Sequence, residues 1–154
     1  MNTYLDGLRT EDTKLLRSNA LASKVTRKNV AFDGSAGNGA IGTVALFTVT
    51  GTVLVKITPV CTENLVGATA TIEVGISGDT ATLIAQTTGT DVDANEIWHD
   101  ATPDADIEAA SVMKEFIITN GQDIILTVAT AAVSDGTIDF FCFWEALSAD
   151  GYVE

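Results

Sequence analysis

The stretch that decides the fold class is Thr52-Val53-Leu54-Val55-Lys56-Ile57-Thr58-Pro59-Val60. Val53, Val55 and Ile57 occupy every second position, and Lys56 and Thr58 lie between them. Side chains of a β-strand point alternately to the two faces of a sheet, so this pattern predicts a strand with one buried and one solvated face.

Similar patterns recur on both sides of that stretch. We expect about eight strands, with no convincing helix among them. They fall at residues 29–32, 44–49, 52–60, 69–76, 82–86, 115–119, 123–130 and 137–146. Ser77-Gly78-Asp79 predicts a turn, and Asn120-Gly121 and Asp135-Gly136 each predict a β-hairpin. We therefore predict an all-β fold, an antiparallel β-sandwich that is jelly-roll-like, with a barrel as the alternative and a βαβ fold excluded.

Length and composition agree with one globular domain. The chain has 154 residues, of which 46% are hydrophobic and 19% are charged, enough for a sizeable core. No apolar run approaches the roughly 20 residues that span a bilayer, and the first residues lack a signal-peptide pattern. We expect Cys61 and Cys142 to be reduced, buried thiols, and not a disulfide or part of a metal site.

Charge divides the chain into two segments. Beyond residue 28, two lysines face 18 acids, which gives a net charge of −16. Such asymmetry indicates an interaction arm. We predict an anchoring arm over residues 1–28, as one helix or an extended strap. A glycine-rich linker with a first strand follows over 29–43, and the β-sandwich over 44–154. The arm contains six of the eight basic residues, namely Arg9, Lys14, Arg17, Lys24, Arg27 and Lys28.

One strand is apolar on both faces. In Ile138-Asp139-Phe140-Phe141-Cys142-Phe143-Trp144 the even positions are all apolar, and Phe141 and Phe143 make the other face apolar too. A strand of a two-layer sandwich normally has one solvated face. We therefore expect Phe141 and Phe143 to be covered by a loop, by the arm or by another subunit.

The acidic stretch from Thr87 to Glu108 is the candidate ligand loop. Asp91-Val92-Asp93-Ala94-Asn95 resembles the start of an EF-hand, but Glu96 replaces the turn glycine and Thr102 replaces the last glutamate, so an EF-hand is excluded. A solvated acidic loop is the simplest interpretation. The alternatives are an irregular calcium site drawn from Asp91, Asp93, Asp100, Asp104 or Asp106, and a ligand-contact set of Asp91, Asp93, Trp98 and His99.

No motif carries catalytic chemistry. Gly37-Asn38-Gly39-Ala40-Ile41-Gly42 matches G-x-G-x-x-G, but it leads into a predicted strand, whereas a dinucleotide site needs a helix there. His99, the single histidine, has no nucleophile motif near it. We expect no enzyme activity, catalytic residue, cofactor or metal. The −16 charge also disfavours nucleic-acid binding by the β-domain, and we expect no membrane partner.

Several stretches between Ala45 and Gly151 are informative together. They are Leu46-Phe47-Thr48-Val49-Thr50-Gly51-Thr52-Val53-Leu54-Val55, Glu73-Val74-Gly75-Ile76-Ser77-Gly78-Asp79-Thr80, Asp93-Ala94-Asn95-Glu96-Ile97-Trp98, Ala101-Thr102-Pro103-Asp104-Ala105 and Leu147-Ser148-Ala149-Asp150-Gly151. The stretch that contains them resembles small virion proteins of tailed bacteriophages. That class includes capsid decoration proteins, head fibres and tail-associated modules, commonly trimers of β-sandwiches anchored through an N-terminal segment.

The resemblance implies a location in the virion, after synthesis in the bacterial cytoplasm. We expect a virion structural protein, either a capsid decoration or a head-fibre subunit. It would form a homotrimer, and its N-terminal arm would contact the major capsid protein or another virion protein. The alternative is a host-surface or glycan-binding module of a phage tail or fibre.

Overall fold

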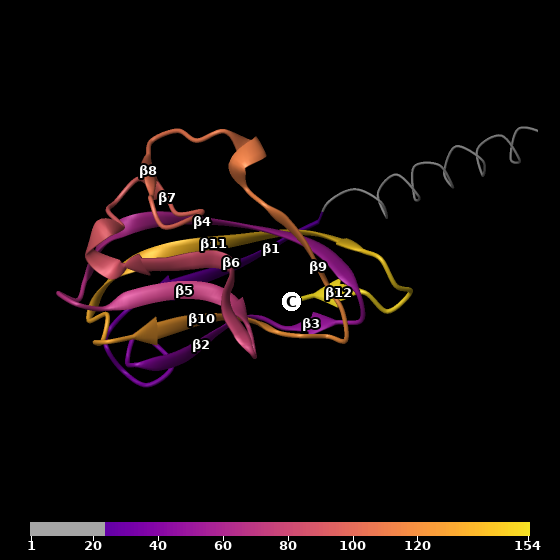
Figure 1. The fold of residues 1–154 in the computed structure, drawn as a ribbon, viewed down its shortest axis with the longest axis horizontal. Helices are drawn as coiled ribbons and strands as arrows, with labels where there is room; N and C mark the ends of the chain where they lie inside the picture. The colour runs from indigo at the N-terminus through magenta and orange to yellow at the C-terminus, as the bar shows by residue number, and fades with distance from the viewer. Residues whose placement is uncertain (1–23) are drawn as a thin grey trace, which may run out of the picture.

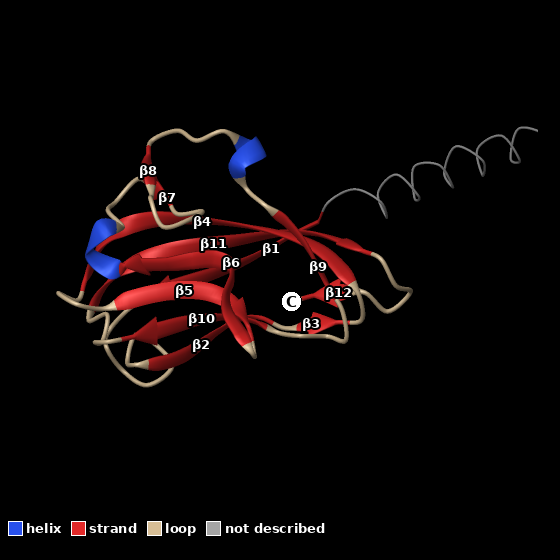
Figure 2. Cartoon of the chain, in the orientation of Figure 1, coloured by secondary structure: helices blue, strands red, loops and turns tan. Residues whose placement is uncertain are grey.

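The computed structural model describes residues 24–154, which form an all-β fold of twelve strands (Figures 1 and 2). The larger sheet has the order β1 (Lys24–Ala31), β11 (Asp135–Ala146), β4 (Val53–Val66), β7 (Glu96–Ile97) and β8 (Asp104–Ala105), and β9 (Glu115–Ile118) also pairs with β4. The second sheet has the order β2 (Gly42–Phe47), β10 (Ile124–Ala129), β5 (Thr71–Ile76) and β6 (Asp79–Thr88). β12 (Tyr152–Val153) pairs with β3 (Val49–Thr50).

All the strand pairs of the described residues are antiparallel, and the two main sheets form two layers. Two short 3-10 helices, η1 (Gly89–Asp91) and η2 (Ala110–Val112), lie between β6 and β9. No helix within residues 24–154 is long and apolar enough to cross a membrane. The predicted all-β antiparallel sandwich is therefore confirmed.

A single core fills the space between the two layers. In β4 every second side chain from Val53 to Cys61 is buried, and the residues between them are half-buried. β11 buries Ile138, Phe140, Cys142 and Trp144 in the same way. The second sheet contributes its own alternating residues to this core, Ile72 and Val74 of β5 and Ile124, Leu126 and Val128 of β10 among them. The period-2 pattern of the sequence is thus the pattern of burial.

The large sheet begins five residues before the strand predicted at residue 29. β1 pairs with β11 along its whole length, from Lys24 opposite Trp144 to Ala31 opposite Thr137. Lys24, Arg27 and Lys28, predicted to belong to the arm, are therefore part of an edge strand. The sequence gives little sign of this strand because an edge strand is solvated on both faces near its start, and Val30 is its only fully buried residue. Lysines on edge strands also discourage unwanted pairing with other sheets. Arg9, Lys14 and Arg17 lie outside the described residues.

Two of the predicted turns do not close hairpins. Asn120 and Gly121 have φ angles of 58° and 59°, as the predicted hairpin turn requires. However, β9 pairs with β4, whereas β10 pairs with β2 and β5. The turn therefore carries the chain from the large sheet to the second sheet, and this places Ile118 before it and Ile124 after it in the core that the two sheets share. The hairpin prediction is wrong for this pair.

The Asp135-Gly136 hairpin is wrong for a related reason. Both residues belong to the start of β11, in the large sheet, whereas β10 before them belongs to the second sheet. Ser77-Gly78, in contrast, does join two paired strands, since Ile76 of β5 lies opposite Asp79 of β6. The predicted turn there is confirmed.

The glycine-rich segment between β1 and β2 is a set of tight turns that packs on the sandwich. The carbonyl oxygen of Ser35 accepts hydrogen bonds from the backbone N–H groups of Asn38 and Ala40, and the N–H of Val133 donates to the carbonyl of Gly39 at 2.8 Å. As the sequence indicated, the segment leads into a strand, β2, and not into a helix.

Candidate functional site

The face of β1, β11, β4 and β9 that points away from the core, called here the outer face, carries exposed apolar side chains. Val25 of β1 lies opposite Phe143 of β11, and Leu54 of β4 lies opposite Ile117 of β9. Phe143 and Leu54 line one shallow groove. Phe143 lies opposite Lys56 and Leu54 lies opposite Glu145, so the two apolar pairs are diagonal neighbours on this face. The exposed fraction is 45% for Val25, 37% for Phe143 and 63% for Ile117. We call these four residues the outer strip.

Arg27 covers one of the two aromatic side chains that needed a cover. It lies opposite Phe141 on the same face, with its guanidinium carbon 5.2 Å from the centre of the Phe141 ring. This is a cation–π distance, and Phe141 is half-buried. Phe143 lies two residues further along β11 and stays exposed. Within the described residues, the cover predicted for both is therefore made for Phe141 alone.

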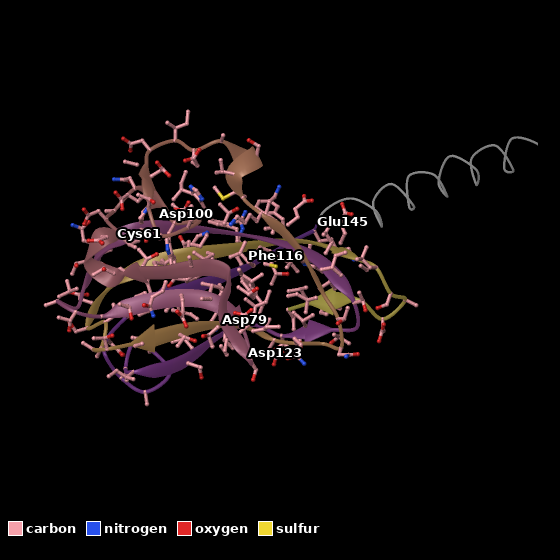
Figure 3. The ribbon with its side chains drawn as sticks, in the orientation of Figure 1. Cys61, Asp79, Asp100, Phe116, Asp123 and Glu145 are labelled. Atoms are coloured by element: carbon pink, nitrogen blue, oxygen red, sulfur yellow. The ribbon has the colours of Figure 1, made fainter. Side chains whose placement is uncertain are left out.

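Charged side chains lie between and beside the two apolar pairs of the outer strip. The groove at Phe143 is also lined by Lys56, Glu115 and Glu145. Lys56 Nζ lies 4.0 Å from a carboxylate oxygen of Glu115, and that carboxylate side chain is mostly exposed, so the pair contributes little to stability. Exposed apolar side chains beside charged ones are common at protein–protein contact surfaces. Figure 3 shows Glu145 and Phe116 on the strands that form this end of the sheet.

The two remaining cations of β1 do not belong to the outer strip. Lys24 Nζ lies 4.7 Å from the ring centre of Trp144, whose side chain is buried. The Trp144 indole N–H donates to the Thr26 hydroxyl, which in turn donates to the carbonyl of Val153. Lys28 is exposed at the sheet edge. The three basic residues of β1 therefore spread over both faces of this strand and do not form one patch.

Trp98, predicted as part of a ligand-contact set, lies in the core. It is fully buried, its backbone N–H donates to the carbonyl of Pro59 and its indole N–H donates to the Thr87 hydroxyl at 2.8 Å. Its ring meets Phe140 edge to face, with 6.4 Å between the ring centres. A ligand at the surface has no access to this ring. Trp98 instead fixes the acidic loop to the sandwich.

His99, the next residue, meets a group of carboxylates. Its Nε2 atom lies 3.1 Å from Asp104 Oδ2 and 3.4 Å from Glu108 Oε2, and its Nδ1 atom lies 3.7 Å from Asp100 Oδ2. The His99 side chain is only 10% exposed. We call His99, Asp104 and Glu108 the His99 cluster. Figure 3 shows Asp100 beside the excursion of the chain that carries β7 and β8.

The structure brings together only some of the acids that the sequence singled out. Asp104 belongs to the His99 cluster and Asp100 faces it, whereas Asp91 in η1, Asp93 and Asp106 are exposed and have no contact with His99. Glu108 was missed. No short motif marks it, because it reaches His99 only after the chain has turned back through the pairing of β7 with β8.

The two cysteines are free and buried, as expected. Cys142 lies opposite Ile57 and Cys61 lies opposite Ile138, so they are separated by four residues along the paired strands, about 13 Å. Burial raises the pKa of the Cys142 thiol to about 12. Burial also raises the pKa of Cys61 to about 11, although a hydrogen bond to the backbone of Glu63 acts against this shift. Neither thiol is a nucleophile at neutral pH.

Comparisons with known proteins give one structural likeness. No family model and no curated protein matches this sequence. Among solved structures, a chain of the acidic stable capsid structure of Helicobacter pylori bacteriophage KHP30 has 12% sequence identity and a TM-score of 0.49. The match covers 86% of this chain and 94% of that chain. A likeness of this degree assigns no role to any residue, so the function has to be argued from the residues of the chain itself.

Proposed function

We propose that the chain is a structural protein of a bacteriophage virion, a capsid decoration or head-fibre subunit, with an assembly role and not a catalytic one. The observation that carries this proposal is the outer strip, in which two exposed apolar pairs lie diagonally across four neighbouring strands of one sheet. Exposed apolar surface bordered by charge is a common sign of a protein–protein contact. The resemblance of the sequence to small phage virion proteins supplies the class of assembly.

We further propose that residues 1–23 of a second copy cover the outer strip, in a homotrimer. The segment joins the sheet at Lys24, directly beside Val25 of the strip. Its sequence offers five leucines, Leu5, Leu8, Leu15, Leu16 and Leu21, for the apolar pairs. It also offers three cations as partners for Glu115, although three acids in the same segment bring its net charge to zero.

Length permits this arrangement. The strip crosses four neighbouring strands, so it is about 15 Å wide, and about five extended residues span that distance. The segment therefore has ample length to cross a neighbour's strip and still leave residues that contact another virion protein. A trimer would present three such segments to the virion together, and avidity would strengthen a contact that is weak for one segment alone.

Light scattering of the full-length protein tests the contact. We expect the wild-type protein to have the mass of a trimer and the Phe143→Ser variant to have the mass of a monomer at the same concentration. Ile41→Ser is the matched control, because Ile41 is as exposed as Ile117 but lies in the turn before β2; this variant should stay trimeric. A Phe143→Ser protein that stays trimeric would show that the outer strip is not the contact surface.

The alternative, a host-surface or glycan-binding module, has less support. Its main attraction was an aromatic side chain beside acids in the 87–108 loop, where a sugar ring could stack. The indole of Trp98 is fully buried and makes its hydrogen bond to Thr87. The loop therefore offers no exposed tryptophan, and the outer strip is the stronger candidate surface.

A further inference from the structure

We propose that the His99 cluster binds one divalent transition-metal ion, with Zn²⁺ as the ion that fits it best. The inference does not depend on a virion location or on the outer strip. It rests on the spacing of the three ligand atoms, on the charge around His99 and on how firmly the surrounding backbone holds these side chains.

The spacing matches a tetrahedral site. With bonds of about 2.0–2.2 Å to nitrogen and oxygen, two ligands of a tetrahedral Zn²⁺ lie about 3.4 Å apart. His99 Nε2 lies 3.1 Å from the Asp104 oxygen and 3.4 Å from the Glu108 oxygen. All three ligand atoms lie within 4.8 Å of one another. A small rotation of the more exposed Asp104 side chain completes a three-ligand site with an open fourth position.

The negative charge around His99 favours a bound cation. Asp100, Asp104 and Glu108 place three carboxylates around one imidazole, so even an imidazolium would leave two negative charges in excess. Within residues 24–154, no lysine or arginine forms an ion pair with these three carboxylates. The His99 side chain is nine-tenths buried, and repulsion between like charges is stronger at such a site than in water. Because a metal-bound imidazole is neutral, a divalent ion lowers the charge of the three carboxylates from three negative charges to one.

Backbone groups already orient two of the carboxylates. One oxygen of Asp100 accepts a hydrogen bond from the N–H of Thr102 at 2.7 Å, and its other oxygen faces His99 Nδ1. One oxygen of Glu108 accepts from the N–H of Ala109, and its other oxygen faces Nε2. A carboxylate on the second imidazole nitrogen is the usual support of a metal-bound histidine. Asp100 Oδ2 lies 3.7 Å from Nδ1, so it faces that nitrogen beyond hydrogen-bond distance.

The sandwich holds the histidine in place. Trp98 is anchored in the core, and the Thr87 hydroxyl that accepts its indole N–H also donates to the carbonyl of Asp100 at 3.1 Å. The backbone is therefore fixed immediately before and after His99. Asp104 comes from β8, which pairs with β7. A metal at this point would tie the β7–β8 excursion to the segment that carries Glu108.

Calorimetry with Zn²⁺ alone tests the proposal on the full-length, EDTA-treated protein. We expect one Zn²⁺ per chain and the visible spectrum of tetrahedral Co²⁺ when Co²⁺ replaces it. His99→Gln and Glu108→Gln should each weaken Zn²⁺ binding at least about tenfold, since even a supporting residue is worth that much. Ca²⁺, which prefers six to eight oxygen ligands, should not displace Zn²⁺.

Asp79→Asn is the matched control, because it removes one exposed carboxylate at the start of β6, outside the cluster. It should bind Zn²⁺ like the wild-type protein. Circular dichroism checks the fold of each variant, and Glu108→Gln alone decides the question if His99→Gln does not fold. Absence of saturable Zn²⁺ binding, equal weakening by Asp79→Asn, or displacement by Ca²⁺ would each overturn the proposal.

Discussion

The hydrogen bond between Trp98 and Thr87 offers a quantitative test of how the acidic loop is held. Trp98→Phe removes the indole N–H and leaves a small cavity in the core. We expect a loss of about 1 kcal/mol for the hydrogen bond and about 1–2 kcal/mol for the smaller side chain. Thr87→Val keeps the shape but leaves the indole N–H buried without an acceptor, which costs about 1–3 kcal/mol.

The double variant separates the hydrogen bond from the packing. Because each single change removes the same bond, the Trp98→Phe/Thr87→Val protein should be destabilised by about 1 kcal/mol less than the sum of the two single effects. Urea unfolding followed by circular dichroism gives the three free energies, provided that the slope with urea is unchanged. If the two single losses instead add to the loss of the double variant within about 0.3 kcal/mol, as independent sites do, the two side chains are not coupled by this hydrogen bond.

Two further predictions concern backbone strain and buried thiols. Gly136 and Gly78 have similar φ angles, 105° and 100°, but an added Cβ at Gly136 would lie 2.5 Å from the Asn64 carbonyl oxygen, whereas at Gly78 it would meet nothing within 4 Å. Gly136→Ala should therefore cost at least about 2 kcal/mol more than Gly78→Ala in urea unfolding, and equal losses would contradict this. Cys142, with its pKa raised to about 12 by burial, should react with Ellman's reagent at pH 8 only after unfolding. The folded thiol keeps its proton above pH 9.0, the ordinary pKa of a cysteine thiol. The stability contributed by this bound proton is therefore complete below pH 9 and is lost as pH rises toward 12. Fast reaction of Cys142 in the folded protein would contradict its burial.

The sequence predicted the strands whose burial alternates, and it placed β11 well because the inner face of that strand is fully apolar. β4 was found for the same reason, but it extends to Val66, six residues past its predicted end. It failed where local chemistry permits two outcomes. Asn120-Gly121 favours a sharp reversal in any fold, and only the burial of both Ile118 and Ile124 in one core decides that the chain changes layer. β1 was partly missed because its lysines and arginine are typical of a solvated arm as well as of an edge strand.

The candidate sites depend on long-range pairing, which explains how little of them the sequence contained. Phe143 was singled out from its own strand, but Val25 and Ile117 join it only through the register of β1 and β9. Trp98 and His99 are neighbours in sequence, and alternation alone cannot say which of them enters the core. Glu108 joins His99 because two residues of β7 pair with two residues of β8, a pairing too short to leave a pattern.

We propose that this chain is part of a virion as a trimer, and that the outer strip is the contact surface of that trimer. The most direct test of this proposal is to supply a phage that lacks the gene with either the wild-type or the Phe143→Ser chain, and to measure the chain in purified particles by quantitative mass spectrometry. We expect particles to contain the wild-type chain and the Ile41→Ser control at equal levels, and little or no Phe143→Ser chain. Particles without the wild-type chain, or with a full level of the Phe143→Ser chain, would contradict it.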